Sequence, residues 1–321
     1  MSVFSIPDAV PSRVLAVYRY LLRARKQRES RETLERVLMP QGLADLSSKK
    51  GEPEEAEAEP PVQDSAAAQP SAPEGEEKGG RGMIKRVLAA CESMRLLEKD
   101  GDGVVLSPDL PKAARDPKHA EDLAPLTLCD LFLKPENPIN HDLARTIAWY
   151  LDFDPQRPPA DWNFLDREHR EQVRSLHMNN LARYGQLREW GCYLGFTWTF
   201  SSKKSTQFLI PDPTKHLRLR LPQLFPKPRA SRAFTEVLAD LAGLCGIFEE
   251  GVFRRENEQA GRSKPLDGRT LTRASAHAWL RLQEEGVVEM SHASDADAVQ
   301  LPDDDQVVLY SQVRWRGEAR G

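Results

Sequence analysis

Basic residues placed where a helix or a hairpin could present them to a polyanion are the clearest candidates for chemistry in this chain. Arg269, Arg273 and Arg281 lie at multiples of four residues, which predicts a basic stripe along one helix face. Lys203 and Lys204 lie in a short polar turn between two apolar segments. Such side chains contact phosphates, and arginine also reads base edges in the major groove. The pattern indicates nucleic-acid binding, although water-exposed helices commonly carry a charged face as well.

The sequence carries no recognisable motif for catalysis. It has no glycine-rich phosphate loop, no metal-binding histidine pair and no nucleophile elbow. Several Pro-Asp pairs match one half of a nuclease signature, but the Glu-x-Lys that would complete it occurs only at 76–78, in a low-complexity segment. The cysteines lie far apart and have no zinc-type spacing, which predicts reduced thiols: Cys91, Cys129, Cys192 and Cys245. We therefore predict a protein that is not an enzyme and holds no metal or cofactor.

The elements that would position the basic residues recur three times, as an amphipathic helix followed by two short strands. The three copies of helix, first strand and second strand fall at 83–91, 96–97 and 104–106; at 180–187, 195–200 and 207–210; and at 270–282, 287–290 and 298–301. A helix and a tight hairpin form the second half of a winged helix-turn-helix. We predict a mainly α fold with small β-hairpins (α+β), built from tandem winged helix-turn-helix modules at 1–115, 116–220 and 221–321.

Hydrophobic patterns predict which faces are buried. An apolar stripe at helical spacing follows residues 14–22, and the helix after it is expected to turn Val37 inward. Phe196, Trp198 and Phe200 alternate with threonines, which predicts a strand whose aromatic face lies in the core.

A segment at 47–80 differs in composition from the rest of the chain. It holds nine acidic and three basic residues, five prolines and no aromatic residue. Such a composition cannot bury enough apolar area to offset the loss of chain entropy, so we predict a disordered acidic insertion in the first module. The whole chain has a formal net charge of −4. Because this segment carries more negative charge than that, the remainder is slightly basic, which is compatible with binding DNA.

The winged-helix hypothesis also predicts which side chains touch DNA. The third helix of such a module enters the major groove and the wing approaches phosphates. Candidate contacts on these elements and on the first helix are Arg19, Arg23, Lys85, Arg86, Arg183, Gln186, Arg188, Lys203, Lys204, Arg269, Arg273 and Arg281. The third wing is acidic at Asp295, Asp297 and 303–305. The third module is therefore better suited to protein contact or dimerisation than to reading DNA.

Hydropathy gives an expectation for location. The chain has no signal-peptide type of apolar core and no apolar run of the roughly 18 residues that a membrane span needs. We expect a cytoplasmic protein that does not enter a membrane.

The first 22 residues, with Phe4-Ser5-Ile6-Pro7 and Pro11-Ser12-Arg13-Val14-Leu15, resemble the DpdG family, and the resemblance extends over the whole chain. DpdG is a component of bacterial gene clusters that insert 7-deazaguanine derivatives into DNA and restrict unmodified DNA. The resemblance implies a set of partners: double-stranded DNA and the helicase and nuclease-like proteins of a defence system. It provides no catalytic signature to transfer to this chain.

Two functions are compatible with these observations. The first is a non-catalytic DNA-binding adaptor of a DNA modification and restriction system. The second is a protein scaffold whose winged helices dock partner proteins without touching DNA, because the fold by itself does not establish a ligand.

Overall fold

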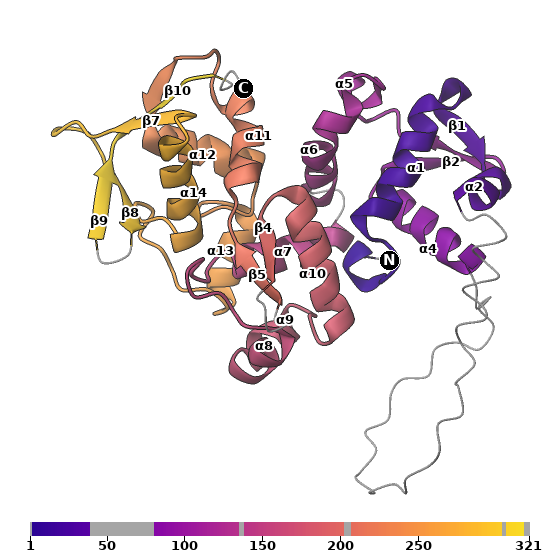
Figure 1. Ribbon diagram of the computed structural model, residues 1–321, viewed down its shortest axis with the longest axis horizontal. Coiled ribbons are helices and arrows are strands. Elements are labelled where there is room, and N and C mark those ends of the chain that lie inside the picture. Colours follow the sequence, from indigo (N-terminus) through magenta and orange to yellow (C-terminus); the bar gives the residue numbers. More distant parts are fainter. Residues whose placement is uncertain (1, 39–79, 135–137, 202–206, 304–305, 318–321) are drawn as a thin grey trace, which may run out of the picture.

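The protein combines many helices with small antiparallel sheets, which confirms the predicted α+β class (Figure 1). The computed structural model describes residues 2–38, 80–134, 138–201, 207–303 and 306–317. The insertion predicted at 47–80 lies outside these ranges, apart from Gly80, where a helix begins. None of the described helices is both long enough and apolar enough to cross a membrane.

The first unit is a three-stranded sheet covered by helices. Its elements are η1 (Val3–Ser5), α1 (Pro11–Arg23), η2 (Arg25–Gln27), β1 (Arg28–Ser30), α2 (Arg31–Leu38), α4 (Gly80–Ser93), β2 (Leu97–Asp100) and β3 (Gly103–Leu106). The predicted hairpin of β2 and β3 is confirmed, and β1 pairs with the other edge of β3 to give the order β1-β3-β2. The apolar stripe of α1 is buried as predicted. Val37 is 45% exposed instead of facing the core, because the side of α2 that packs on the core carries Leu34 and Leu38.

The middle unit is mostly helical and carries a two-stranded hairpin. Its elements are α5 (Lys112–Arg115), α6 (Ala120–Leu133), η3 (Pro138–Asn140), α7 (His141–Tyr150), α8 (Trp162–Glu168), α9 (Arg170–Ser175), α10 (Leu181–Leu194), β4 (Thr197–Ser201), β5 (Gln207–Pro211) and α11 (Thr214–Leu224). The Asn180 side chain caps α10 by accepting a hydrogen bond from the Arg183 amide at 2.9 Å. The predicted pairing of β4 with β5 is confirmed.

The third unit differs from the prediction in its strand pairing. Its elements are β6 (Ser231–Ala233), α12 (Phe234–Leu244), α13 (Val252–Gln259), α14 (Arg273–Glu284), β7 (Val288–Ser291), β8 (Val299–Asp303), β9 (Gln306–Tyr310) and β10 (Gln312–Trp315). We predicted that β7 would pair with β8. Instead β8 pairs with β9, and β7 pairs with β10, because the chain forms a separate hairpin before it returns. The resulting order β6-β10-β7 repeats the order of first, last and middle strand found in the first unit.

The N-terminal segment ties the first unit to the middle unit. Gln186 of α10 donates its amide to the carbonyls of Ile6 at 3.1 Å and Pro7 at 2.8 Å, and Trp190 donates its indole N–H to the Ala9 carbonyl at 2.9 Å. In Figure 1 the first unit and the third unit lie at opposite ends of the long axis, with α6 and α10 between them.

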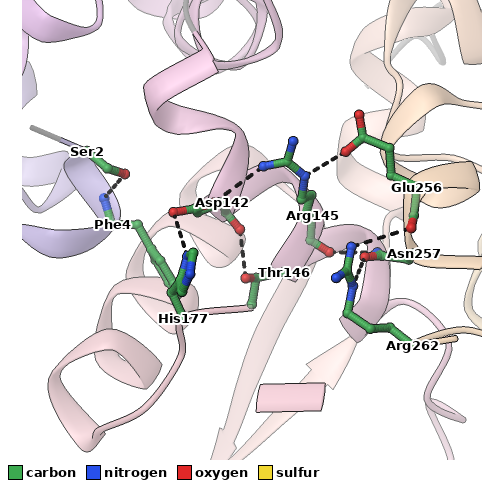
Figure 2. Close-up of polar contacts among 9 residues, drawn as sticks. All are labelled: Ser2, Phe4, Asp142, Arg145, Thr146, His177, Glu256, Asn257 and Arg262. Atoms are coloured by element: carbon green, nitrogen blue, oxygen red, sulfur yellow. Dashed lines mark hydrogen bonds and ion pairs between the residues drawn. The ribbon is translucent and has the colours of Figure 1, made fainter. Parts of the chain in front are cut away.

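A polar network joins the middle unit to the third unit (Figure 2). Arg145 of α7 pairs with Glu256 of α13 at 2.6 Å, and its carbonyl accepts the side-chain amide of Asn257 at 2.9 Å. Arg262 donates in turn to the Asn257 side chain at 2.8 Å. Side chains therefore cross both predicted boundaries between modules, and the boundaries themselves stay a prediction.

The residue after α10 tests how this helix is joined to α11. Gly195 has a φ of +85°, and a Cβ atom there would lie 2.9 Å from the His216 amide nitrogen. We expect Gly195→Ala to lower the free energy of unfolding by about 1–2 kcal/mol or more, because alanine disfavours this left-handed conformation and has no room. Gly185 is the matched control, since a Cβ there meets nothing within 4 Å. Gly185→Ala should stabilise the helix by up to about 1 kcal/mol. Urea denaturation measures both, and equal effects would contradict this description.

Candidate nucleic-acid interface

The predicted contacts of the first unit lie on the outside of α1 and α4. Arg19 forms an ion pair with Glu121, and Arg86 pairs with Asp8 at 2.7 Å. Arg23 and Lys85 are exposed. These side chains remain candidates for phosphate contact, although two of them already have acidic partners.

Helix α10 turns one of its predicted contacts inward. Gln186 is 3% exposed and faces the N-terminal segment, so it is not available to read a base edge in this structure. The pattern of the helix did not show this, because the segment that covers it lies about 180 residues earlier in the chain. Arg183 donates to the His177 carbonyl, and Arg188 donates to the Gln207 side chain at 3.0 Å.

The predicted basic stripe of the third unit is only partly helical. Helix α14 begins at Arg273, so Arg269 lies before it, in a turn that follows Gly268, and pairs with Asp297 at 3.1 Å. Arg273 pairs with Asp154 of the middle unit at 3.3 Å. Two members of the stripe line different clefts: Arg273 lines one beside α7 and α13, and Arg281 lines one beside the hairpin of β4 and β5. Lys203 and Lys204 lie outside the described residues.

The cleft that Arg281 lines lies between the hairpin of β4 and β5, the start of α11 and the end of α14. It has a volume of about 580 Å³ and is lined by Cys192, Thr197, Trp198, Thr199, Asp212, Thr214, Lys215, Arg218, Arg281 and Glu285. We call it the hairpin cleft. It brings Arg281 of the third unit next to the hairpin of β4 and β5.

Two aromatic side chains are exposed on this hairpin. Trp198 is 44% and Phe200 is 50% exposed, with their rings 6.4 Å apart in an edge-on arrangement. The predicted aromatic core face is therefore wrong for these two residues, and right for Phe196, which is fully buried. The reason is position: Phe196 precedes β4 and stacks on His216, whereas β4 carries the other two away from the core.

Charges of both signs line the hairpin cleft. Arg281 pairs with Asp212 at 2.9 Å and with Glu285 at 3.1 Å, and Arg218 also pairs with Glu285. Asp212 is almost fully buried and accepts the Thr214 amide at 3.0 Å, so it holds Arg281 in place. With Lys215 included, the lining has three cations and two carboxylates. An exposed indole beside oriented guanidinium groups suits a nucleic acid, because bases stack on aromatic rings and phosphates pair with arginine.

A second cleft of about 890 Å³ lies between α7, α13 and the start of α14. Arg254, nearly buried, donates to Asp152 at 3.1 Å and to the Lys264 carbonyl at 2.8 Å, and pairs with Glu258 at 3.5 Å. Burial raises the pKa of Asp152 to about 6, although the nearby Arg254 opposes the shift. This cleft holds a partly desolvated ion pair, and among the predicted DNA contacts that the structure describes, Arg273 alone lines it.

The structure also assembles a group that the spacing of the sequence did not suggest. Cys129, His216 and Cys245 are buried, and their ligand atoms lie within 4.8 Å of one another. Burial would raise the pKa of the Cys245 thiol, but a hydrogen bond from Cys129 and the nearby His216 and Arg220 lower it well below its ordinary value. The three residues come from separate parts of the chain, so no local motif announces them.

These features define a helical α+β protein in which small hairpins project from packed helices and one hairpin carries an aromatic and basic cleft. A model of the DpdG-like family matches residues 1–296, and the chain belongs to this family. The resemblance of the sequence to DpdG is thereby confirmed. Family membership suggests involvement in a 7-deazaguanine modification system. No curated protein and no solved structure matches the chain.

The raised pKa of Asp152 predicts a pH dependence of stability. The folded protein holds this proton to about pH 6, whereas the unfolded chain releases it near the ordinary value of 3.8. The free energy of unfolding should therefore fall as the pH rises through this window, by an amount of order 1–3 kcal/mol. Asp152→Asn removes this contribution. The stability of the unmutated protein minus that of the variant should decrease from pH 4 to pH 6, and a constant difference would contradict the prediction.

Proposed function

We propose that this protein is a non-catalytic DNA-binding adaptor subunit of a bacterial DNA modification and restriction system. The observation that carries the proposal is the hairpin cleft, where exposed Trp198 lies beside Lys215, Arg218 and Arg281. The exposed ring of Phe200 lies 6.4 Å from that of Trp198 on the same strand. Large exposed aromatic rings are unfavourable in water, and those on a binding surface usually have a partner. A duplex supplies the phosphates for the cations and deoxyribose faces for the rings, and it offers a base face where a base step is unstacked.

The modules that would present these groups are, in our proposal, winged helix-turn-helix units. The first unit supports this through its element order of helix, strand, two helices and a hairpin, with β1 paired to the returning strand β3. The third unit repeats the strand order with β6, β10 and β7. In the middle unit α10 precedes the hairpin, but its face with Gln186 and Trp190 packs on the N-terminal segment. We therefore assign DNA contact in this unit to the hairpin and not to the buried face of α10.

A protein scaffold is the second candidate function, and the hairpin of β8 and β9 favours it. Val307 is 61% exposed and Leu309 is 42% exposed on β9, two residues apart and thus on one face of the strand. Acidic Asp295 and Asp297 precede this hairpin. An apolar and acidic surface suits a protein partner better than DNA. We propose that the third unit contacts other proteins of the same system, such as its helicase or nuclease-like components. The hairpin of β4 and β5, which we call the middle hairpin, contacts DNA.

Truncation of the exposed indole tests the DNA contact. We expect Trp198→Ala to weaken duplex binding by about 1–3 kcal/mol, roughly 5- to 150-fold in Kd, because the apolar surface that the indole buries against the duplex is lost. Leu309→Ala is the matched control, since it also removes an exposed apolar side chain from a hairpin. Fluorescence anisotropy with a labelled duplex measures both variants. If the two variants bind equally well, the hairpin cleft is not the DNA contact.

Charge reversal in the hairpin turn separates the two candidate functions. When a protein neutralises phosphates, the logarithm of its binding constant falls linearly with the logarithm of the salt concentration, with a slope of about 0.9 for each phosphate. Reversing Lys203 and Lys204 to glutamate should therefore reduce this slope by about two. A scaffold would keep its partner proteins in the same variant. The absence of any duplex binding by the unmutated protein at about 50 mM salt would contradict the DNA-binding proposal.

A further inference from the structure

The buried cluster of Cys129, His216 and Cys245 brings together three helices, one of which, α11, also lines the hairpin cleft. Cys129 lies in α6, His216 in α11, and Cys245 directly follows α12. All three residues are fully buried. Their ligand atoms, two thiol sulfurs and an imidazole nitrogen, lie within 4.8 Å of one another. Cysteine thiolates and histidine nitrogens are the usual ligands of zinc in proteins, and two cysteines with one histidine hold zinc where water or substrate takes the fourth position.

The imidazole of His216 is held in the orientation that a metal ligand needs. Its Nδ1 lies 2.9 Å from the Leu194 carbonyl, which can only accept a hydrogen bond, so Nδ1 carries the proton. Its Nε2 accepts a hydrogen bond from Nε of Arg220 at 3.2 Å and thus presents a lone pair. The ring also stacks on Phe196, with centroids 4.1 Å apart. Metal-bound histidines are typically fixed in this way, by donation of the second ring nitrogen to a carbonyl.

The charges around the cluster balance when a divalent cation is present. Two thiolates neutralise the cation, and the buried guanidinium of Arg220 is neutralised by Asp130, with which it forms an ion pair. Arg220 also donates to Gln223 at 2.8 Å, so it keeps two partners when Nε2 of His216 turns to a metal. Its Nε–H can then donate to a thiolate sulfur. A buried charge without such partners would be strongly unfavourable.

We propose that Cys129, His216 and Cys245 bind one Zn²⁺ ion. Bonds of about 2.0–2.3 Å in tetrahedral geometry place ligand atoms about 3.3–3.8 Å apart, so the cluster has to contract by no more than about 1.5 Å. The described residues supply three ligands, and water can complete the fourth position. The ion fastens α6 to α11 and α12. Lys215 and Arg218 of α11 line the hairpin cleft, so the zinc ion also fixes the position of these two basic side chains.

The metal content of the full-length protein tests this site directly. We expect about one zinc per chain by elemental mass spectrometry after purification without chelator. After removal of the zinc, Co²⁺ should bind in the same ratio and give the intense thiolate-to-cobalt absorption of a cysteine site. Cys129→Ser and Cys245→Ser should abolish both signals. Cys91→Ser is the matched control, because Cys91 is equally buried but lies in α4 of the first unit.

A second measurement keeps the proposal testable if a cluster variant does not fold. X-ray absorption of the zinc-loaded, unmutated protein should show two sulfur ligands and at least one imidazole nitrogen. The proposal would be overturned if Cys245→Ser kept its zinc, or if the bound zinc had no sulfur ligand. It would also be overturned if the unmutated protein contained no metal and gave no cobalt absorption. A disulfide between Cys129 and Cys245 in peptide maps of the protein as purified, before any removal of zinc, would overturn it as well. None of these outcomes depends on whether the protein binds DNA.

Discussion

The packing of α10 is the constraint on which the rest of the structure depends. Trp190 is fully buried, donates to the Ala9 carbonyl and meets Phe132 of α6 edge-on at 4.9 Å. The same helix ends at Gly195, against the backbone of His216. Because buried polar groups must be paired and cores are close-packed, α10 fixes the N-terminal segment, α6, the middle hairpin and α11 relative to one another. The hairpin cleft and the Cys129, His216 and Cys245 cluster both rest on this arrangement.

Most of the candidate basic side chains at the surface are held by partners within the protein. Most of the predicted DNA contacts that the structure describes have a carboxylate or a carbonyl as partner, as Arg281 does with Asp212. Such pairs on exposed side chains contribute little to stability, but they orient the guanidinium groups. A phosphate that enters the hairpin cleft would compete with Glu285 for two arginines. The aromatic rings on β4 then add a contribution to binding that salt does not screen.

The sequence predicted the elements much better than their partners. Helical periodicity identified α1, α4, α10 and α14, and turn residues identified two of the three hairpins. It missed the pairing of β7 with β10, because strand patterns show that a strand exists but not which distant strand it meets. Alternation placed Trp198 in a core face, since the pattern cannot show where a hairpin leaves the core. The sequence did not predict the cluster of Cys129, His216 and Cys245 either, because these residues are far apart in the chain and come together only through tertiary packing.

Photo-crosslinking would show whether DNA lies against the hairpin of β4 and β5, as we propose. A duplex with photoreactive bases would be irradiated with the full-length protein, and crosslinked peptides would be identified by mass spectrometry. Our account predicts crosslinks in β4, in β5 and at the start of α11, with few in the hairpin of β8 and β9. Crosslinks confined to α1 and α4, or spread evenly over the surface, would contradict it.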